Sequence, residues 1–164
     1  MTPVVSPIMV RHPSRYSYGT TAAVVTSVGL IVGFAAASVS KAVVVSGLLI
    51  IALADNVSDS LSIHVYQESE NLEARAAFRA TLTNFIARLV VALSFVGVVL
   101  ALPIRVAQMA AIGWGIVLLA GLTYVLSRHR NVRASREILK HLIVAIVVIV
   151  VSRALGSWIA AHVS

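Results

Sequence analysis

Five long apolar stretches, joined by short polar or charged links, dominate the pattern of hydrophobic and polar positions along the chain. Their apolar residues come in unbroken runs such as Leu142–Val151, without the alternation that strands of a membrane barrel show. A helix needs roughly 20 predominantly apolar residues to cross a bilayer. The pattern therefore predicts five transmembrane helices, at Thr20–Ser40, Ala42–Tyr66, Thr83–Leu102, Val106–Ser127 and Ile138–Ala160.

The segments that flank these stretches leave little room for anything else. Residues 1–18 contain three prolines and no apolar core of a signal peptide, so we predict an N-terminal tail there. Residues 19–164 are predicted to form a single five-helix transmembrane domain. Pro103 lies between the third and fourth stretches and predicts a turn, because proline does not continue a helix comfortably.

Composition agrees with this class of protein. The chain has 164 residues, of which 59% are hydrophobic and 12% charged, whereas soluble domains are about 45–50% apolar and about 25% charged. The sequence therefore predicts an all-α integral membrane protein. It contains no cysteine, which excludes a disulfide scaffold and a thiol nucleophile. No HExxH, GxSxG or P-loop pattern occurs, and we predict neither an enzyme nor a bound cofactor.

The positive charges indicate an orientation. Lys and Arg outnumber Asp and Glu by 13 to 6, for a net charge of +7. With the N-terminus inside, the outer links carry only Lys41 and Arg105. The inner segments carry Arg11, Arg15, Arg75, Arg79, Arg128, Arg130, Arg133, Arg136 and Lys140. The positive-inside rule then predicts a cytoplasmic N-terminus and an external C-terminus. The basic excess indicates topology and contact with the lipid bilayer, not binding to nucleic acid.

The acidic residues are concentrated on the second stretch. Asp55 and Asp59 are four residues apart, and at 1.5 Å per residue Asp55 lies about 20 Å from the outer end of the helix. Ser58 and Ser62 share their face. Intramembrane carboxylates are costly and usually functional, and oxygen ligands suit hard divalent cations. The predicted cation ligands are Asp55, Asn56, Ser58, Asp59, Ser62, His64 and Glu68.

Two alternatives stay open at this point. Asp55 or Asp59 can instead pair with Arg88 or Asn84 of the third stretch and hold the helices together. Likewise, the GxxxG motif at Gly29–Gly33 permits close helix contact, either between two copies of the chain or within one chain.

The stretch Ala54–Glu70, with its pattern Ala-Asp-x-x-Ser-Asp-x-x-x-Ile-His followed by Glu-Ser-Glu, resembles a divergent prokaryotic branch of the vacuolar iron transporter (nodulin-like) family. The resemblance implies a homodimer with a metal path between the subunits and a counter-flow of protons. Two family features are missing: Thr21-Ala22-Ala23 stands where the first-helix carboxylate is expected, and there is no acidic cytoplasmic hairpin.

These observations give two expectations of function. The first is a dimeric transporter that exports a divalent cation, such as Fe or Mn, from the cytoplasm across a prokaryotic plasma membrane, driven by protons. Asp55 and Asp59 would bind the cation, and His64 and Glu68 would form the cytoplasmic mouth beside Glu70 and Glu73. The second is a non-transporting subunit of a larger membrane complex.

Overall fold

The computed structural model describes residues 14–69 and 74–163 of the chain. These residues form helices and no strand, which confirms the all-α prediction. Their bounds are α1 (Ser14–Ala36), α2 (Lys41–Ser69), α3 (Ala74–Ala101), α4 (Ile104–His129) and α5 (Ala134–His162). All five contain candidate membrane spans, of 18 to 29 residues. The chain therefore has the architecture of a multi-pass integral membrane protein.

Several helices extend beyond the apolar stretches from which they were predicted. α1 begins at Ser14, inside the predicted tail, and α3 begins at Ala74, well before Thr83. The added part of α3, about two and a half turns, contains Ala76, Ala77 and Arg79. Alanine and arginine are among the best helix formers, so the helix continues where apolar character ends.

The helix ends are set by local backbone chemistry. Ser38 follows α1 in the left-handed conformation, with φ 57°. The Val39 N–H donates to the Phe34 carbonyl at 3.3 Å, the bond of a Schellman motif that closes a helix. This motif ends α1 at Ala36, earlier than the predicted Ser40. Asn131, with φ 53°, has the same role after α4. Pro103 occupies the N-cap of α4 with φ −58°, as the predicted turn requires.

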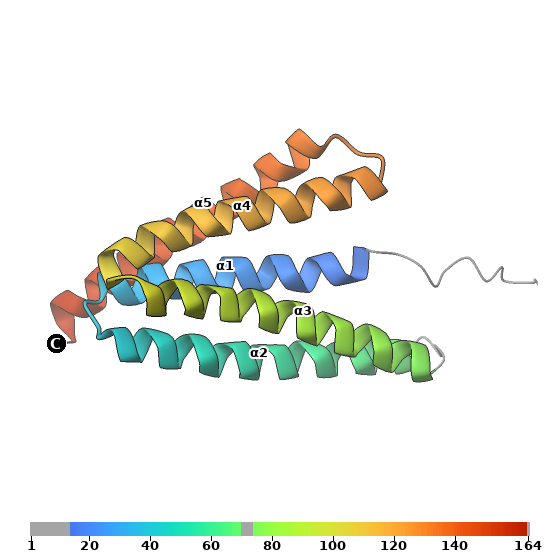
Figure 1. Ribbon diagram of the computed structural model, residues 1–164, viewed down its shortest axis with the longest axis horizontal. Coiled ribbons are helices and arrows are strands. Elements are labelled where there is room, and N and C mark those ends of the chain that lie inside the picture. The colour runs from blue at the N-terminus through green and yellow to red at the C-terminus, as the bar shows by residue number, and fades with distance from the viewer. Residues whose placement is uncertain (1–13, 70–73, 164) are drawn as a thin grey trace, which may run out of the picture.

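The helix α1 lies in the middle of the bundle, with α2 and α3 on one side and α4 and α5 on the other (Figure 1). Half of its candidate span is buried, against 11% for α5. The start of α1, the end of α2 and the α4–α5 link lie at one end of the molecule (Figure 1). The α1–α2 and α3–α4 links and the end of α5 lie at the other.

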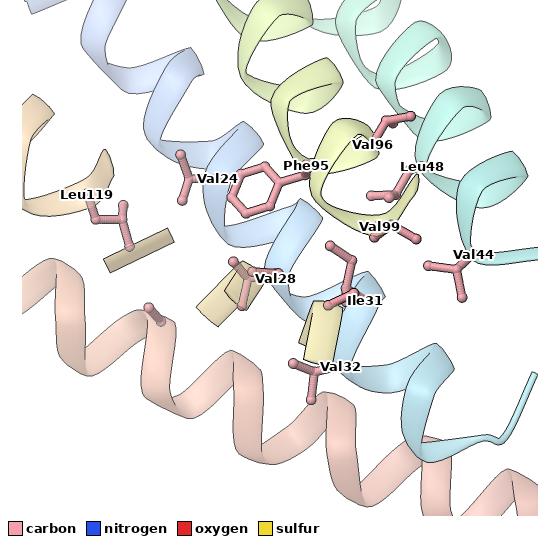
Figure 2. Close-up of a cluster of buried hydrophobic side chains, with 13 residues drawn as sticks. Val24, Val28, Ile31, Val32, Val44, Leu48, Phe95, Val96, Val99 and Leu119 are labelled. Carbon is pink, nitrogen blue, oxygen red and sulfur yellow. The ribbon is translucent and has the colours of Figure 1, made fainter. Parts of the chain in front are cut away.

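The core gathers around one face of α1. Val24, Val28 and Ile31 of this helix pack against Phe95 and its neighbours on α3 (Figure 2). Leu48 of α2 and Leu119 of α4 complete the cluster from the two sides. Valine, isoleucine and leucine at helical spacing thus bury the central helix, while the outer helices keep apolar faces exposed, as contact with lipid requires.

Small residues bring α1 and α5 together. A Cβ atom on Gly156 would collide with the backbone carbonyl oxygen of Gly33, and one on Gly29 would lie 2.8 Å from Val148 Cγ1. The GxxxG motif Gly29–Gly33 is therefore used within the chain, against α5. Of the two alternatives that the sequence left open, the structure adopts the intrachain one.

Candidate functional site

The helices α2 and α3 lie side by side and run in opposite directions (Figure 1). Polar side chains of both helices converge on Arg88, midway along α3. The Arg88 side chain is 3% exposed, and its guanidinium donates from three nitrogens. Nε donates to Asn56 Oδ1 at 2.7 Å, Nη1 donates to Asp59 Oδ2 at 3.0 Å, and Nη2 forms a short ion pair with Asp55 Oδ2. Asn84 Nδ2 donates to the same Asp59 oxygen at 3.0 Å. We call Asp55, Asn56, Asp59, Asn84 and Arg88 the Arg88 cluster.

The helical repeat explains why these residues meet. Asp55 and Asp59 are one turn apart on α2, and Asn84 and Arg88 are one turn apart on α3. Because the two helices run in opposite directions, Arg88 reaches the Asp55 level and Asn84 the Asp59 level. The planar guanidinium offers five donors in a fixed fork, which suits binding to several acceptors at once.

Gly19 of the central helix α1 leaves space for the cluster because it has no side chain. A Cβ atom there would overlap Asn84 Oδ1 and would lie 3.0 Å from Arg88 Cδ. Glycine thus lets the backbone of α1 lie directly on the two α3 side chains. The cluster is consequently enclosed by three helices on its inner side.

The two carboxylates are much less enclosed than the arginine. The side chain of Asp55 is 48% exposed and that of Asp59 is 36% exposed. Two carboxylates and one guanidinium leave the cluster with a formal charge of −1. Asp55 also lies halfway along α2, within the candidate membrane span Lys41–Tyr66. An excess negative charge therefore lies on the exposed side of a helix that is long enough to span a membrane.

Three buried polar atoms at or near the cluster have no hydrogen-bond partner among the described residues. They are Asn56 Nδ2, Ser60 Oγ and Asn84 Oδ1. Leaving a buried donor or acceptor unpaired costs about 1–3 kcal/mol, so these atoms would gain from a bound polar species. Two of the three are oxygens, the ligand type that hard cations prefer.

A cavity borders the cluster on its α1 side. Its polar lining consists of Thr26 and Ser27 from α1 with Asp55, Asn56 and Arg88. Thr26 is exposed whereas Ser27 is buried. With a volume of about 10 Å³, the cavity has room for about one water molecule beside Asp55, Asn56 and Arg88.

The predicted cation ligands are only partly brought together. Asp55 and Asp59 meet around Arg88, as the helix-pairing alternative predicted, and Asn56 joins them there. Ser58 and Ser62 are exposed on the flank of α2, where Ser62 Oγ donates to the Ser58 carbonyl at 2.9 Å.

The remaining predicted residues lie away from the cluster or outside the description. His64 is half-buried, more than one turn beyond Asp59. The side chain of Glu68 lies outside the described residues, as do Glu70 and Glu73. Over the described part of the chain, no three His, Cys, Asp or Glu side chains lie close enough together to hold a metal ion.

From the sequence, Arg88 and Asn84 were named only as alternative partners of the aspartates, although their spacing could have identified them as site residues. They are two strongly polar residues four positions apart in a predominantly apolar stretch, the same spacing as Asp55 and Asp59. Ser60, Gly19 and the cavity residue Thr26 were missed as site residues, because their role depends on how the three helices pack.

Comparisons with family models, curated proteins and solved structures found no match to this chain. The resemblance to the vacuolar iron transporter family therefore stays a prediction from the motif on α2.

Proposed function

We propose that the chain is a membrane carrier that binds a cation at the Arg88 cluster. The observation that carries this proposal is the unbalanced charge: Asp55 and Asp59 are partly exposed at membrane depth, and Arg88 neutralises only one of them. A net charge within the hydrocarbon region costs several kcal/mol unless a counter-charge is present. A mobile cation that visits the cluster would supply that charge.

The charge count favours a divalent cation shared between two copies of the chain. One cluster carries a formal charge of −1, so two clusters that face each other carry −2 and match one divalent ion. The carboxylate, amide and hydroxyl oxygens of the cluster and its surroundings suit Mn or Fe(II) better than soft metals. The exposed carboxylates of α2 are thus a physical reason to propose the homodimer that we expected from the sequence.

Arg88 would act as a tethered counter-ion in this carrier. While no metal ion is bound, the guanidinium keeps the two carboxylates from repelling each other. A bound metal ion would compete with Arg88 for Asp55 and Asp59, and protonation of either carboxylate would favour release of the metal. Such an exchange would couple metal export from the cytoplasm of a prokaryotic cell to protons, with His64 and Glu68 at the inner mouth.

A flux assay tests the proposal. Full-length protein in liposomes should transport Mn(II) when a pH gradient is imposed across the membrane. The Asp59→Asn variant should slow that flux about tenfold or more, because a charged ligand is lost. Val57→Ala is the matched control, since Val57 lies on the same helix and is 57% exposed. Equal fluxes for Asp59→Asn and wild type would contradict the proposal.

A second candidate function is that of a non-transporting subunit of a larger membrane complex. It is favoured by the pairing of both aspartates with Arg88, the arrangement expected of a fixed link between helices. In that case a basic side chain of a partner would balance the remaining charge. Native mass spectrometry of the purified protein distinguishes the two: a homodimer with bound metal supports the carrier, and a fixed ratio with one other chain supports the subunit.

A further inference from the structure

A second polar cavity, of about 120 Å³, lies on the opposite side of α1 from the Arg88 cluster. It is enclosed by α1, by the last turns of α4 and by the first turns of α5, at the end of the molecule where the α4–α5 link lies (Figure 1). Its polar lining consists of Thr21, Thr123, Ser127, Arg130, Glu137 and His141. Since a water molecule occupies roughly 30 Å³ in the liquid, the cavity admits a small polyatomic group.

Two hydroxyl groups of α4 line this cavity while nearly their whole residues are buried. Ser127 is 2% exposed and Thr123 is 3% exposed. Both side chains belong to the lining of the cavity. A buried hydroxyl that faces a polar cavity is a donor available to a ligand.

The contacts of His141 determine how Thr123 is used. His141 Nδ1 lies 2.9 Å from the Glu137 carbonyl oxygen and 3.3 Å from Thr123 Oγ1. A carbonyl oxygen only accepts, so Nδ1 carries the proton and Thr123 Oγ1 accepts from it as well. The hydroxyl proton of Thr123 is then free to be donated into the cavity.

The charges around the cavity select an anion. Arg130 lines it, and Arg128, Arg133, Arg136 and Lys140 lie at the same end of the bundle. The one carboxylate of the lining, Glu137, binds the ammonium of Lys140 at 2.7 Å. A cation would be repelled by this set of charges, whereas an oxyanion would meet a guanidinium and two hydroxyl donors.

We propose that this cavity binds a phosphate group, as the headgroup of an anionic phospholipid presents it. The helix ends place the cavity at the level where headgroups lie, and basic pockets between transmembrane helices bind such headgroups on the cytoplasmic side. Arginine forms strong, charge-assisted bonds to phosphate oxygens. The positive-inside rule explains why arginines gather at this end, but it requires neither a cavity nor buried hydroxyls in its wall.

Native mass spectrometry of the full-length protein in detergent tests the site with three probes: phosphatidylglycerol, phosphatidylcholine and inorganic phosphate. Phosphatidylglycerol should bind more tightly than phosphatidylcholine. Arg130→Gln should weaken its binding about tenfold or more, and Ser127→Ala about threefold or more. Arg136→Gln is the matched control, because it removes the same charge at the same end from a residue outside the lining, and it should change binding less than about twofold.

Each outcome decides the proposal or the source of the phosphate. If inorganic phosphate binds alone and is weakened by the same two variants, the ligand is a soluble phosphate. Equal binding of the two lipids, or equal effects of Arg130→Gln and Arg136→Gln, would overturn the site in favour of general surface electrostatics. Should Arg130→Gln fail to fold, Ser127→Ala carries the test, since it removes only one oxygen atom.

Discussion

At the scale of the residue, Arg88 is the most constrained charge in the described part of the chain. Removing one partner of a buried ion pair costs about 3–5 kcal/mol, because the other charge is left without compensation. Arg88→Gln leaves Asp55 and Asp59 one turn apart with no cation between them. We expect this substitution to lower the free energy of unfolding by about that amount, measured by titration of the purified protein with a denaturing detergent.

The same substitution at Arg153, which is exposed on α5, is the control and should cost less than about 1 kcal/mol. In the double variant Arg88→Gln with Asp59→Asn, part of the loss should be recovered, because one of the two repelling charges is gone. If Arg88→Gln were as stable as Arg153→Gln, the cluster would not hold α2 and α3 together.

Ser38 offers a change in the opposite direction. It adopts a left-handed backbone conformation, with φ 57°, which costs a non-glycine residue roughly 1–2 kcal/mol. Glycine takes this conformation without that cost, although it also loses more entropy on folding. Ser38→Gly should therefore raise the free energy of unfolding by about 0.5–1 kcal/mol in the same assay.

Ser58→Gly provides the contrast, because Ser58 is exposed in the interior of α2. There the same substitution should lower stability by about 0.5 kcal/mol. If both serine variants changed the free energy of unfolding in the same direction, the left-handed conformation of Ser38 would contribute nothing to the end of α1.

At the scale of the element, the contact of α1 with α5 depends on the absence of side chains. The backbones approach at Gly33 and Gly156 so closely that a methyl group does not fit. Gly156→Ala should force the helices apart and lower stability by about 1–3 kcal/mol, the usual cost of overpacking. Gly121→Ala is the control, because nothing lies within 4 Å of its added Cβ atom. It should be neutral or slightly stabilising, since alanine favours helix.

How much of this architecture could be predicted differs from one element to another. The five helices follow from long, predominantly apolar stretches, which specify a membrane span almost alone. The ends of the helices do not follow from hydropathy. The end of α1 depends on the backbone geometry at Ser38, and the first turns of α3 depend on helix propensity. The GxxxG motif predicted a close contact without naming α5 as the partner.

The candidate sites show the same division. Asp55 and Asp59 were predictable because carboxylates at membrane depth are rare and their spacing places them on one face. Their ion pair with Arg88 was one of two open alternatives, since the sequence states the charges but not which helices are neighbours. The cavity that contains Thr123 and His141 combines residues from three helices. None of these residues has a distinctive local pattern, so only packing brings them together.

At the scale of the whole molecule, α1 separates two polar regions with different charge. The Arg88 cluster, on the α2–α3 side, has a formal charge of −1 and lies halfway along α2. The cavity on the α4–α5 side is rich in arginine and lies at one end of the bundle. A cation carrier would use the first region for transport, and the second would hold that end of the bundle at the anionic headgroups.

The proposed direction of transport depends on which end of the bundle faces the cytoplasm, and the lack of cysteine makes this end easy to test. Arg105, in the first turn of α4, and Arg133, at the N-cap of α5, are both exposed. The starts of these two helices lie at opposite ends of the molecule (Figure 1). A membrane-impermeant maleimide should label Arg105→Cys in intact cells and Arg133→Cys only after the cells are permeabilised, because the positive charges favour a cytoplasmic α4–α5 link. The reverse labelling would show the opposite orientation, with the arginine-rich cavity outside. Labelling of both variants in intact cells would contradict the membrane-spanning arrangement itself. The variants leave α2 unchanged, so their metal flux should equal that of the wild type and link the labelled orientation to a functional protein.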